Sequence, residues 1–225
     1  YVAPTPAQQA AAVAKLAETG EAAVPVLPYL IRILGEPIDP VVRQAVVDGL
    51  VKIGKPAVQL AIGGLKSSNP AARQSAIEAL GQLADKEAIA PVLDAYLNDQ
   101  AGSVRDAALG ALAKLVVLEP AALEKLMATA QDKAAKPEIR GRAIKLIGRL
   151  AGPAVPVEPL VAILQDAGED IRMRCAAADA LGRNKSPAAV APLVAALADK
   201  SASMRVWAAV ALNGSSDPSA IAALV

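Results

Sequence analysis

The chain has 225 residues, with 23 Lys and Arg against 22 Asp and Glu, and it contains no histidine and a single cysteine, Cys175. Its formal net charge of +1 gives no overall basic field of the kind that attracts nucleic acid or an anionic membrane surface. The lack of histidine and of a second cysteine excludes an intrachain disulfide, a thiolate metal cluster and a histidine-based catalytic triad.

Alanine dominates the composition, with 53 residues. It is the best helix former, and alternating runs of β-branched residues are missing, so an all-α fold is predicted. The mean hydropathy of +0.38 also follows from alanine. No window of about 18 residues is free of charges, as a membrane-spanning helix would require, and no transmembrane segment is therefore predicted.

Six similar segments recur along the chain, each opening on a small aliphatic residue or methionine followed by arginine. They span 42–54, 72–84, 104–115, 139–151, 173–184 and 204–214. A small or short aliphatic residue stands three positions after each arginine, and leucine or isoleucine stands seven positions after it. Since these offsets fall on one helical face, each segment predicts a helix with one buried face.

A second kind of segment, rich in leucine and alanine, follows each of the first five of these helices, and one more precedes the first helix. In chain order these segments are 26–34, 57–65, 89–97, 121–130, 157–164 and 190–197. Four of them contain a proline, which we place in the first turn of a helix because its missing N–H costs little there. Short breakers such as Lys55-Pro56 and Ser186-Pro187 separate the two helices of a unit.

Helix pairs this short cannot bury their apolar faces alone, so neighbouring pairs are expected to stack into an α-solenoid. We predict one domain over 1–225, built from about seven units: 7–36, 40–68, 70–99, 102–132, 137–167, 171–199 and 202–225. The first unit lacks the arginine and the last is incomplete. Because the sequence starts at Tyr1 and stops within an unfinished helix, we expect a processed, exported chain or a fragment, or an end that another chain completes. The compartment is not predicted.

The sequence pattern of these units resembles that of HEAT repeats, in particular the short repeats of phycobilisome-lyase-type HEAT-like proteins. The segment MRCAAADALG (173–182) followed by VAPLVAALAD (190–199) carries the pattern almost completely, and ARQSAIEALG (72–81) with IAPVLDAYLND (89–99) is similar. The resemblance covers 7–225 and implies a right-handed all-α solenoid of stacked HEAT-like helix pairs. Such repeats serve scaffolds, regulatory subunits, lyases and adaptors, so the resemblance implies the fold more narrowly than the function.

The recurring arginines form what we call the arginine ladder: Arg43, Arg73, Arg105, Arg140, Arg174 and Arg205. Acidic residues stand just ahead of the ladder at the unit boundaries: Asp39, Asp99, Asp132, Asp166 and Asp199. An aspartate there can cap the next helix and pair with an arginine of its own or a neighbouring repeat. We therefore predict that the ladder is structural. The alternative is an exposed strip that binds a partner.

Two further features are candidates for partner docking. Arg142, Lys145 and Arg149 lie at positions i, i+3 and i+7 of a locally basic segment, either as a solvated helix flank or as a patch for an acidic partner. Trp207 occupies an offset held mostly by small residues elsewhere, and we predict that it covers an exposed end of the stack. The alternative for Trp207 is a partner hot spot. Cys175 is predicted to lie roughly opposite the apolar stripe and to be inert, because no histidine can activate it.

No catalytic or phosphate-binding motif stands out, and the carboxylates are scattered one or two per unit. The second helices present mostly small residues on an inner surface that suits a protein better than phosphate: Ala61, Ala95, Ala128, Ala162, Ala195 and Ala198. We therefore predict a non-enzymatic protein–protein interaction scaffold, an accessory subunit or domain of a multi-subunit complex, with no catalytic residue, cofactor, metal or nucleic acid.

Two alternatives remain open for the function. The resemblance implies a bilin lyase- or isomerase-like factor that acts on a protein-bound chromophore. A HEAT-like nucleic-acid binder is disfavoured by the neutral charge and by the lack of aromatic residues on which bases could stack.

Overall fold

The computed structural model describes residues 3–34, 36, 38–115, 120–150 and 156–225. These residues form fourteen α-helices, two short 3-10 helices and no strand, which confirms the predicted all-α class. The 3-10 helices are η1 (Gly20–Val26) and η2 (Lys86–Ala88). The α-helices are α1 (Pro6–Ala17), α2 (Leu27–Leu34), α3 (Pro40–Ile53), α4 (Pro56–Gly64), α5 (Pro70–Leu83), α6 (Ile89–Asn98), α7 (Gly102–Leu115), α8 (Pro120–Gln131), α9 (Pro137–Arg149), α10 (Glu158–Gln165), α11 (Ile171–Asn184), α12 (Pro187–Ala196), α13 (Ala202–Leu212) and α14 (Pro218–Leu224).

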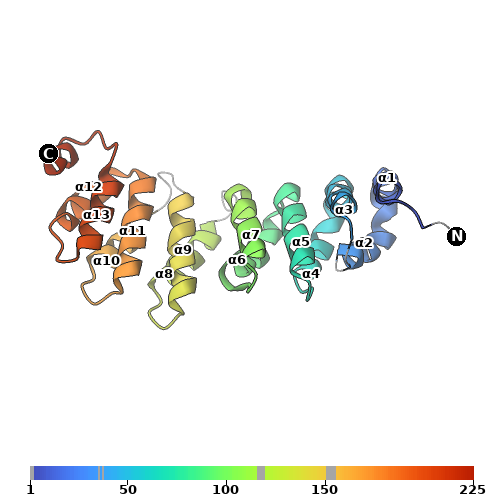
Figure 1. Cartoon of the computed structure of the whole chain (residues 1–225), viewed down its shortest axis with the longest axis horizontal. Helices are drawn as coiled ribbons and strands as arrows, with labels where there is room; N and C mark the ends of the chain where they lie inside the picture. The colour runs from blue at the N-terminus through green and yellow to red at the C-terminus, as the bar shows by residue number, and fades with distance from the viewer. Residues whose placement is uncertain (1–2, 35, 37, 116–119, 151–155) are drawn as a thin grey trace. The chain divides into compact units, whose positions relative to one another are not determined.

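The helices belong to two compact units, Tyr1–Glu119 and Pro120–Val225, called unit 1 and unit 2 below. In unit 1, the first helices of successive repeats, α1, α3, α5 and α7, pack side by side in one row, while α2 packs against α4 in a second row (Figure 1). In unit 2, α9, α11 and α13 form the first row, and α8, α10, α12 and α14 form the second. Each unit is therefore a stack of helix pairs. A single domain over 1–225 stays a prediction, since the helices of predicted unit 102–132 fall into different compact units.

Proline and short polar side chains begin many of these helices. In α3 and α5 a proline is the first residue, and the residue before it, Asp39 or Asn69, accepts a hydrogen bond from the backbone N–H two positions further on. The proline lacks an N–H that would have no partner at this position, and the cap satisfies another. One placement was wrong. Because α12 begins at Pro187, Pro192 lies inside the helix rather than in its first turn.

The predicted buried face is present in all six helices of the ladder. Each ladder arginine is the fourth residue of its helix. The residues three and seven positions after it are at most 2% exposed: Val46, Ala76, Ala108, Ala143, Ala177 and Ala208 at the first offset, and Leu50, Leu80, Leu112, Ile147, Leu181 and Leu212 at the second. The recurring phrase in the sequence is thus the core stripe of the first helix in each repeat.

Neighbouring first helices approach most closely where a glycine faces an alanine. A Cβ added to Gly182 would lie 2.6 Å from the Cα of Ala211, and one added to Gly148 would lie 2.7 Å from the Cα of Ala180. Gly81 makes the same kind of approach to α7 in unit 1. Real Cβ atoms do not come this close to backbone, so the spacing between these helices requires glycine.

Candidate functional site

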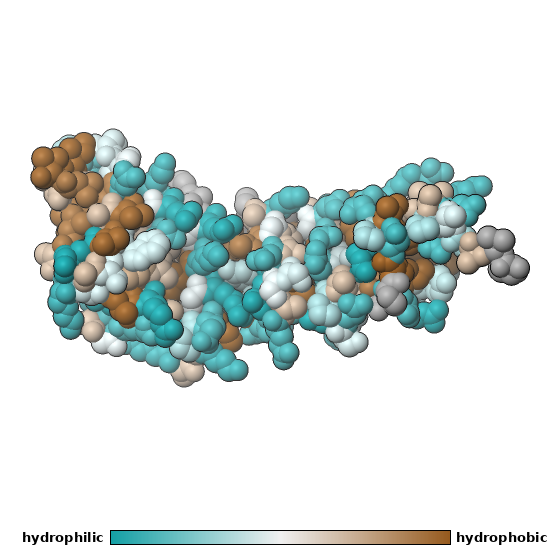
Figure 2. All heavy atoms as spheres, in the orientation of Figure 1, coloured by the Kyte–Doolittle hydropathy of each residue, from teal (hydrophilic) through white to brown (hydrophobic). Residues whose placement is uncertain are grey.

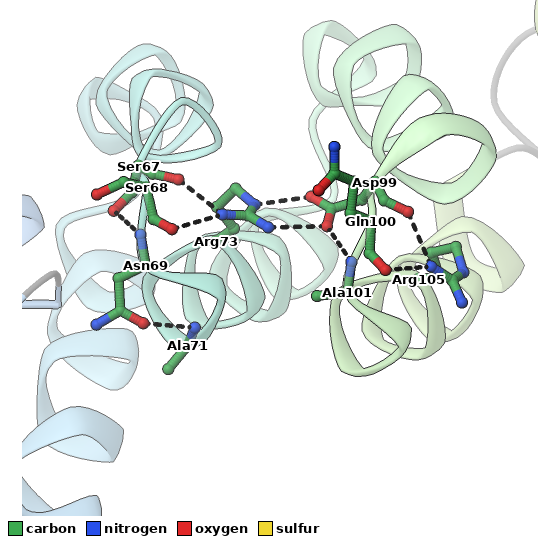
Figure 3. Close-up of polar contacts among 9 residues, drawn as sticks. All are labelled: Ser67, Ser68, Asn69, Ala71, Arg73, Asp99, Gln100, Ala101 and Arg105. Atoms are coloured by element: carbon green, nitrogen blue, oxygen red, sulfur yellow. Dashed lines mark hydrogen bonds and ion pairs between the residues drawn. The ribbon is translucent and has the colours of Figure 1, made fainter.

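The arginine ladder lies at the turns between repeats, as Figure 3 shows for unit 1. The Arg73 guanidinium donates through Nη1 to the carbonyl oxygens of Ser67 and Ser68, at 2.8 and 3.2 Å. Its Nε and Nη2 donate to the two carboxylate oxygens of Asp99, at 2.7 and 2.8 Å. Arg105, in the first helix of the next repeat, α7, donates through Nη1 to the carbonyl oxygens of Asp99 and Gln100. One guanidinium therefore joins the turn before its helix to the turn at the end of its repeat.

Unit 2 repeats this arrangement with small changes. Arg140 donates through Nε to the carbonyl oxygen of Ala130, at 3.1 Å, and binds both carboxylate oxygens of Glu169. Arg174 donates through Nε to the carbonyl oxygen of Leu164, at 2.8 Å, and through Nη2 to Asp199, at 2.6 Å.

Arg43 and Arg205 also donate to backbone carbonyls. Arg43 donates to the carbonyl oxygen of Leu34 at the end of α2. Arg205 donates to the carbonyl oxygens of Asp199 and Lys200 after α12. Since the last carbonyls of a helix have no partner within it, all six arginines act on groups at or just after the end of a second helix.

The carboxylates of the ladder are held in their charged form. A hydrogen bond from the Arg73 side chain lowers the pKa of Asp99, and one from Arg140 lowers the pKa of Glu169. The pKa of Asp199 is lowered first by the backbone N–H of Ser201 and then by Arg174. In the Arg140–Glu169 pair the two side chains are only 6% and 5% exposed. The arginines of these three pairs thus make internal contacts, whereas Arg205 is exposed. A structural role for the whole ladder stays a prediction.

Glu169 is a residue that sequence reasoning missed. Asp166 was expected at this boundary, but it forms an exposed ion pair with Lys133 and accepts the N–H of Gly168. Asp99 and Asp199 stand three residues before the next helix, whereas Asp166 stands five before α11 and Glu169 two before it. Counting back from the following helix would have favoured the glutamate. Asp39 caps α3, and Asp132 accepts the N–H of Ala134.

A second arrangement lies across three first helices of unit 2 and defines the α9–α11–α13 groove, with a volume of about 440 Å³. Its lining residues are Gly141, Lys145, Ile171, Arg172, Cys175, Ala176, Asp179, Ser203 and Trp207. Lys145 and Trp207, two residues singled out for docking, therefore border the same hollow, from α9 and α13. Lys145 is exposed, and Trp207 is 40% exposed. Of the other candidates on α9, Arg142 is half-buried and Arg149 is exposed, and neither lines the groove.

The charged side chains around the groove differ in whether they have an ion-pair partner. Arg172 binds the carboxylate of Asp170, its helix N-cap, and lowers the pKa of that carboxyl to about 2. Asp179, the one acidic residue in the lining, accepts a hydrogen bond from Arg183 at 3.1 Å. Within the described part of the chain Lys145 has no ion pair. Each of these two carboxylates thus has an arginine partner, and Lys145 adds a cation on α9.

The lining also corrects one placement. Cys175 is 9% exposed, so its expected position away from the buried side was wrong; burial raises the pKa of its thiol, which favours the protonated form. Trp207 lines the groove, and Val206 and Val210 on the same helix are 60% and 54% exposed. That Trp207 covers an exposed end of the stack stays a prediction.

Other exposed apolar side chains lie on α14. Ile221 and Leu224 join Val206 and Val210 at this end of unit 2, where Figure 2 shows hydrophobic side chains in brown. Among the small residues expected on the second helices, Ala61 is fully buried, which was a wrong expectation, whereas Ala128, Ala162, Ala195 and Ala198 are exposed and Ala95 is half-buried.

Unit 1 has a comparable hollow between α1 and α3, with a volume of about 550 Å³. Alanines form much of its lining, and it contains no aromatic residue. Its two charged residues have partners: Asp48 accepts a hydrogen bond from Gln44, and Lys52 lies 3.6 Å from Glu18. This α1–α3 hollow is therefore a natural comparison for the groove of unit 2.

The described residues contain no group of three or more His, Cys, Asp or Glu side chains placed to hold a metal ion. Among the described helices, none combines the length and the hydropathy that a bilayer crossing needs.

Comparison with known proteins gives one family and several solved structures. Residues 58–136 and 123–213 match the family model described as HEAT repeats. No curated protein matches the chain. It is similar to the complex of CpcE and CpcF of phycocyanin lyase from Nostoc sp. PCC7120, with 25% identity over 84% of this chain and 98% of that chain and a TM-score of 0.41.

Two other structures are similar over most of the chain. The protein YIBA of E. coli is 21% identical over 94% of this chain and 77% of that chain, with a TM-score of 0.47. Human deoxyhypusine hydroxylase in complex with glycerol is 20% identical over 91% of this chain and 95% of that chain, with a TM-score of 0.33. At these scores the likenesses add nothing on function.

Proposed function

This chain belongs to the HEAT-repeat family, and we propose that it is a non-enzymatic scaffold that binds a protein partner through the α9–α11–α13 groove. In this role it is an accessory subunit or domain of a larger assembly. Stacked repeats suit such a role because each repeat adds surface without a separate core.

The proposal rests on one observation: Lys145 and Trp207 line the same largely apolar hollow. A partly exposed tryptophan beside small residues is typical of the centre of a protein interface, where aromatic anchors supply much of the binding energy. Outside the groove, several carboxyl groups have a lowered pKa because they accept hydrogen bonds from arginine, lysine, a backbone N–H or a hydroxyl. Such contacts suit a structural role rather than a binding role.

The test is an affinity capture from native extract with the full chain and two aromatic variants. We expect the wild-type chain and Tyr29→Ala to recover the same partner in constant ratio, and Trp207→Ala to lose it. Tyr29 is the matched control because it is an exposed aromatic residue, 56% accessible, on α2 of unit 1. Circular dichroism checks that both variants keep their helices. If Trp207→Ala captures the partner as well as the wild type does, the groove is not the binding surface.

The lyase-like alternative makes a different prediction. A bilin lyase or isomerase would transfer or rearrange a bilin on an acceptor protein, which absorbance of the acceptor would report. A scaffold produces no such change at any concentration of the chain.

A further inference from the structure

We infer that the α9–α11–α13 groove binds an acidic amphipathic helix, with an apolar side chain of that helix against Trp207 and its carboxylates facing α9. This inference rests on the proposed function and names the chemistry of the partner segment. Three observations support it: the shape of the floor, the sign of the surrounding charge, and the lack of any backbone edge.

The floor of the groove is the part lined by small residues that add little polar surface. Gly141, Cys175 and Ala176 contribute small side chains or none, and the thiol of Cys175 is protonated under ordinary conditions because burial raises its pKa. Trp207 lines the same groove from α13. The hollow can therefore accept one row of apolar side chains, which gains the hydrophobic contribution of their burial.

The charge around the groove favours an anionic occupant. Lys145 lines it, and Arg149 is exposed on α9 one helical turn away. The acidic lining residue, Asp179, is already paired with Arg183. At larger range, unit 2 carries 13 Lys and Arg against 10 Asp and Glu, whereas unit 1 carries 10 against 12. An acidic segment is thus attracted to unit 2 in particular.

The secondary structure around the groove favours a helix as the occupant. The groove is walled by helices, and no strand lines it. An extended peptide would find no strand edge here to pair with. A helix satisfies its own backbone groups and offers apolar side chains at i, i+3, i+4 and i+7, which is the usual way a groove between helices is filled.

The experiment titrates the full 225-residue chain with synthetic peptides of about 14 residues, four turns of helix. The acidic probe has leucine along one face and glutamate and alanine elsewhere. A second probe has lysine in place of each glutamate, and a third is a scrambled form of the acidic probe. Trp207 is the only tryptophan in the chain, so peptides without tryptophan make its fluorescence a direct signal from the groove.

We expect the acidic probe to shift the Trp207 emission to shorter wavelength with saturation, and the other two probes to produce no such shift. Lys145→Glu should weaken binding of the acidic probe about tenfold or more, with a smaller effect at high salt. Lys125→Glu is the matched control, because it makes the same charge change at an exposed position of α8, outside the groove. It should leave binding within about twofold.

Several outcomes would overturn this inference. They are preferential binding of the lysine probe, equal binding of the scrambled probe, or an equal effect of Lys145→Glu and Lys125→Glu. If the acidic probe fails while Trp207→Ala still loses the captured partner, the scaffold function stands and the acidic-helix occupant is wrong. If Trp207→Ala also keeps the partner, both proposals fail.

Discussion

At the scale of single residues, the ladder shows why arginine recurs at one position. In Arg73 one edge of the planar guanidinium reaches two backbone carbonyls while the other edge holds a carboxylate in two hydrogen bonds. A lysine ammonium can be oriented toward one of these groups but does not present two fixed edges. The same residue thus links the end of one repeat to the end of the next.

The Arg140–Glu169 pair gives a prediction at this scale. Glu169→Gln keeps the shape of the side chain but removes its charge, which leaves the Arg140 guanidinium buried without a counter-ion. We expect the free energy of unfolding to fall by about 3 kcal/mol, the usual consequence of breaking a buried pair. Urea unfolding followed by circular dichroism measures this change.

Asp166→Asn is the control for this variant. It breaks the Lys133–Asp166 pair, in which the side chains are 63% and 36% exposed, and should leave the urea midpoint unchanged. Equal effects of the two substitutions would mean that burial of the Arg140–Glu169 pair does not determine its contribution.

At the scale of elements, the spacing between first helices depends on small residues facing each other. Gly148 and Gly182 stand at the same offset, eight positions after Arg140 and Arg174, and each receives an alanine of the next first helix. This contact lets α9, α11 and α13 lie close enough to share one groove. At the equivalent position of α13 the residue is Asn213, which is exposed.

A pair of glycine substitutions tests this role. In Gly182→Ala the new Cβ would lie 2.6 Å from the Cα of Ala211, so α13 must move, and we expect a loss of about 2 kcal/mol of unfolding free energy. Gly110→Ala in α7 is the control, since an added Cβ there has no atom within 4 Å. It should stabilise the chain by up to about 1 kcal/mol through helix propensity. Thermal unfolding shows whether each variant is less or more stable than the wild type. Stabilisation by Gly182→Ala would contradict the packing argument.

At the scale of the whole molecule, each unit carries at least one buried or half-buried carboxylate bound to a ladder arginine. Unit 1 contains Asp99, and unit 2 contains Glu169 and Asp199. Each has a pKa below its ordinary value, 3.8 for aspartate and 4.5 for glutamate. The unfolded chain therefore binds protons at a higher pH than the folded chain does, and acid should destabilise both units.

Because the folded chain lowers the pKa of these carboxyl groups, its stability should depend on pH in a specific way. The contribution of these groups is fully present above about pH 5, falls as the pH decreases through the ordinary carboxyl values, and is lost below the lowered folded values. Urea midpoints should thus be constant between neutral pH and about pH 5 and then decrease. Glu169→Gln should show a shallower decrease than the wild type. Identical slopes for the two chains would show that the ladder does not account for acid sensitivity.

The sequence by itself determined the repeat and its local consequences. The offsets of three and seven from each ladder arginine correctly identified fully buried residues such as Ala108 and Leu112, because helical periodicity is local and needs no knowledge of neighbours. The stacking of helix pairs also followed, since a short pair must bury its stripe against another. Of the candidate site, Lys145 and Trp207 were identified from sequence as unusual residues, but not as neighbours.

The tertiary structure decided which side chains of different repeats lie next to each other. Lys145 and Asp179 share one offset from their ladder arginines, and Ala176 and Trp207 share another, yet only the close approach of α9, α11 and α13 turns these offsets into one groove. The burial of Cys175 and the choice of Glu169 over Asp166 have the same origin. Such contacts depend on distances across the stack, which side-chain volumes on facing helices set and which the period along one helix does not encode.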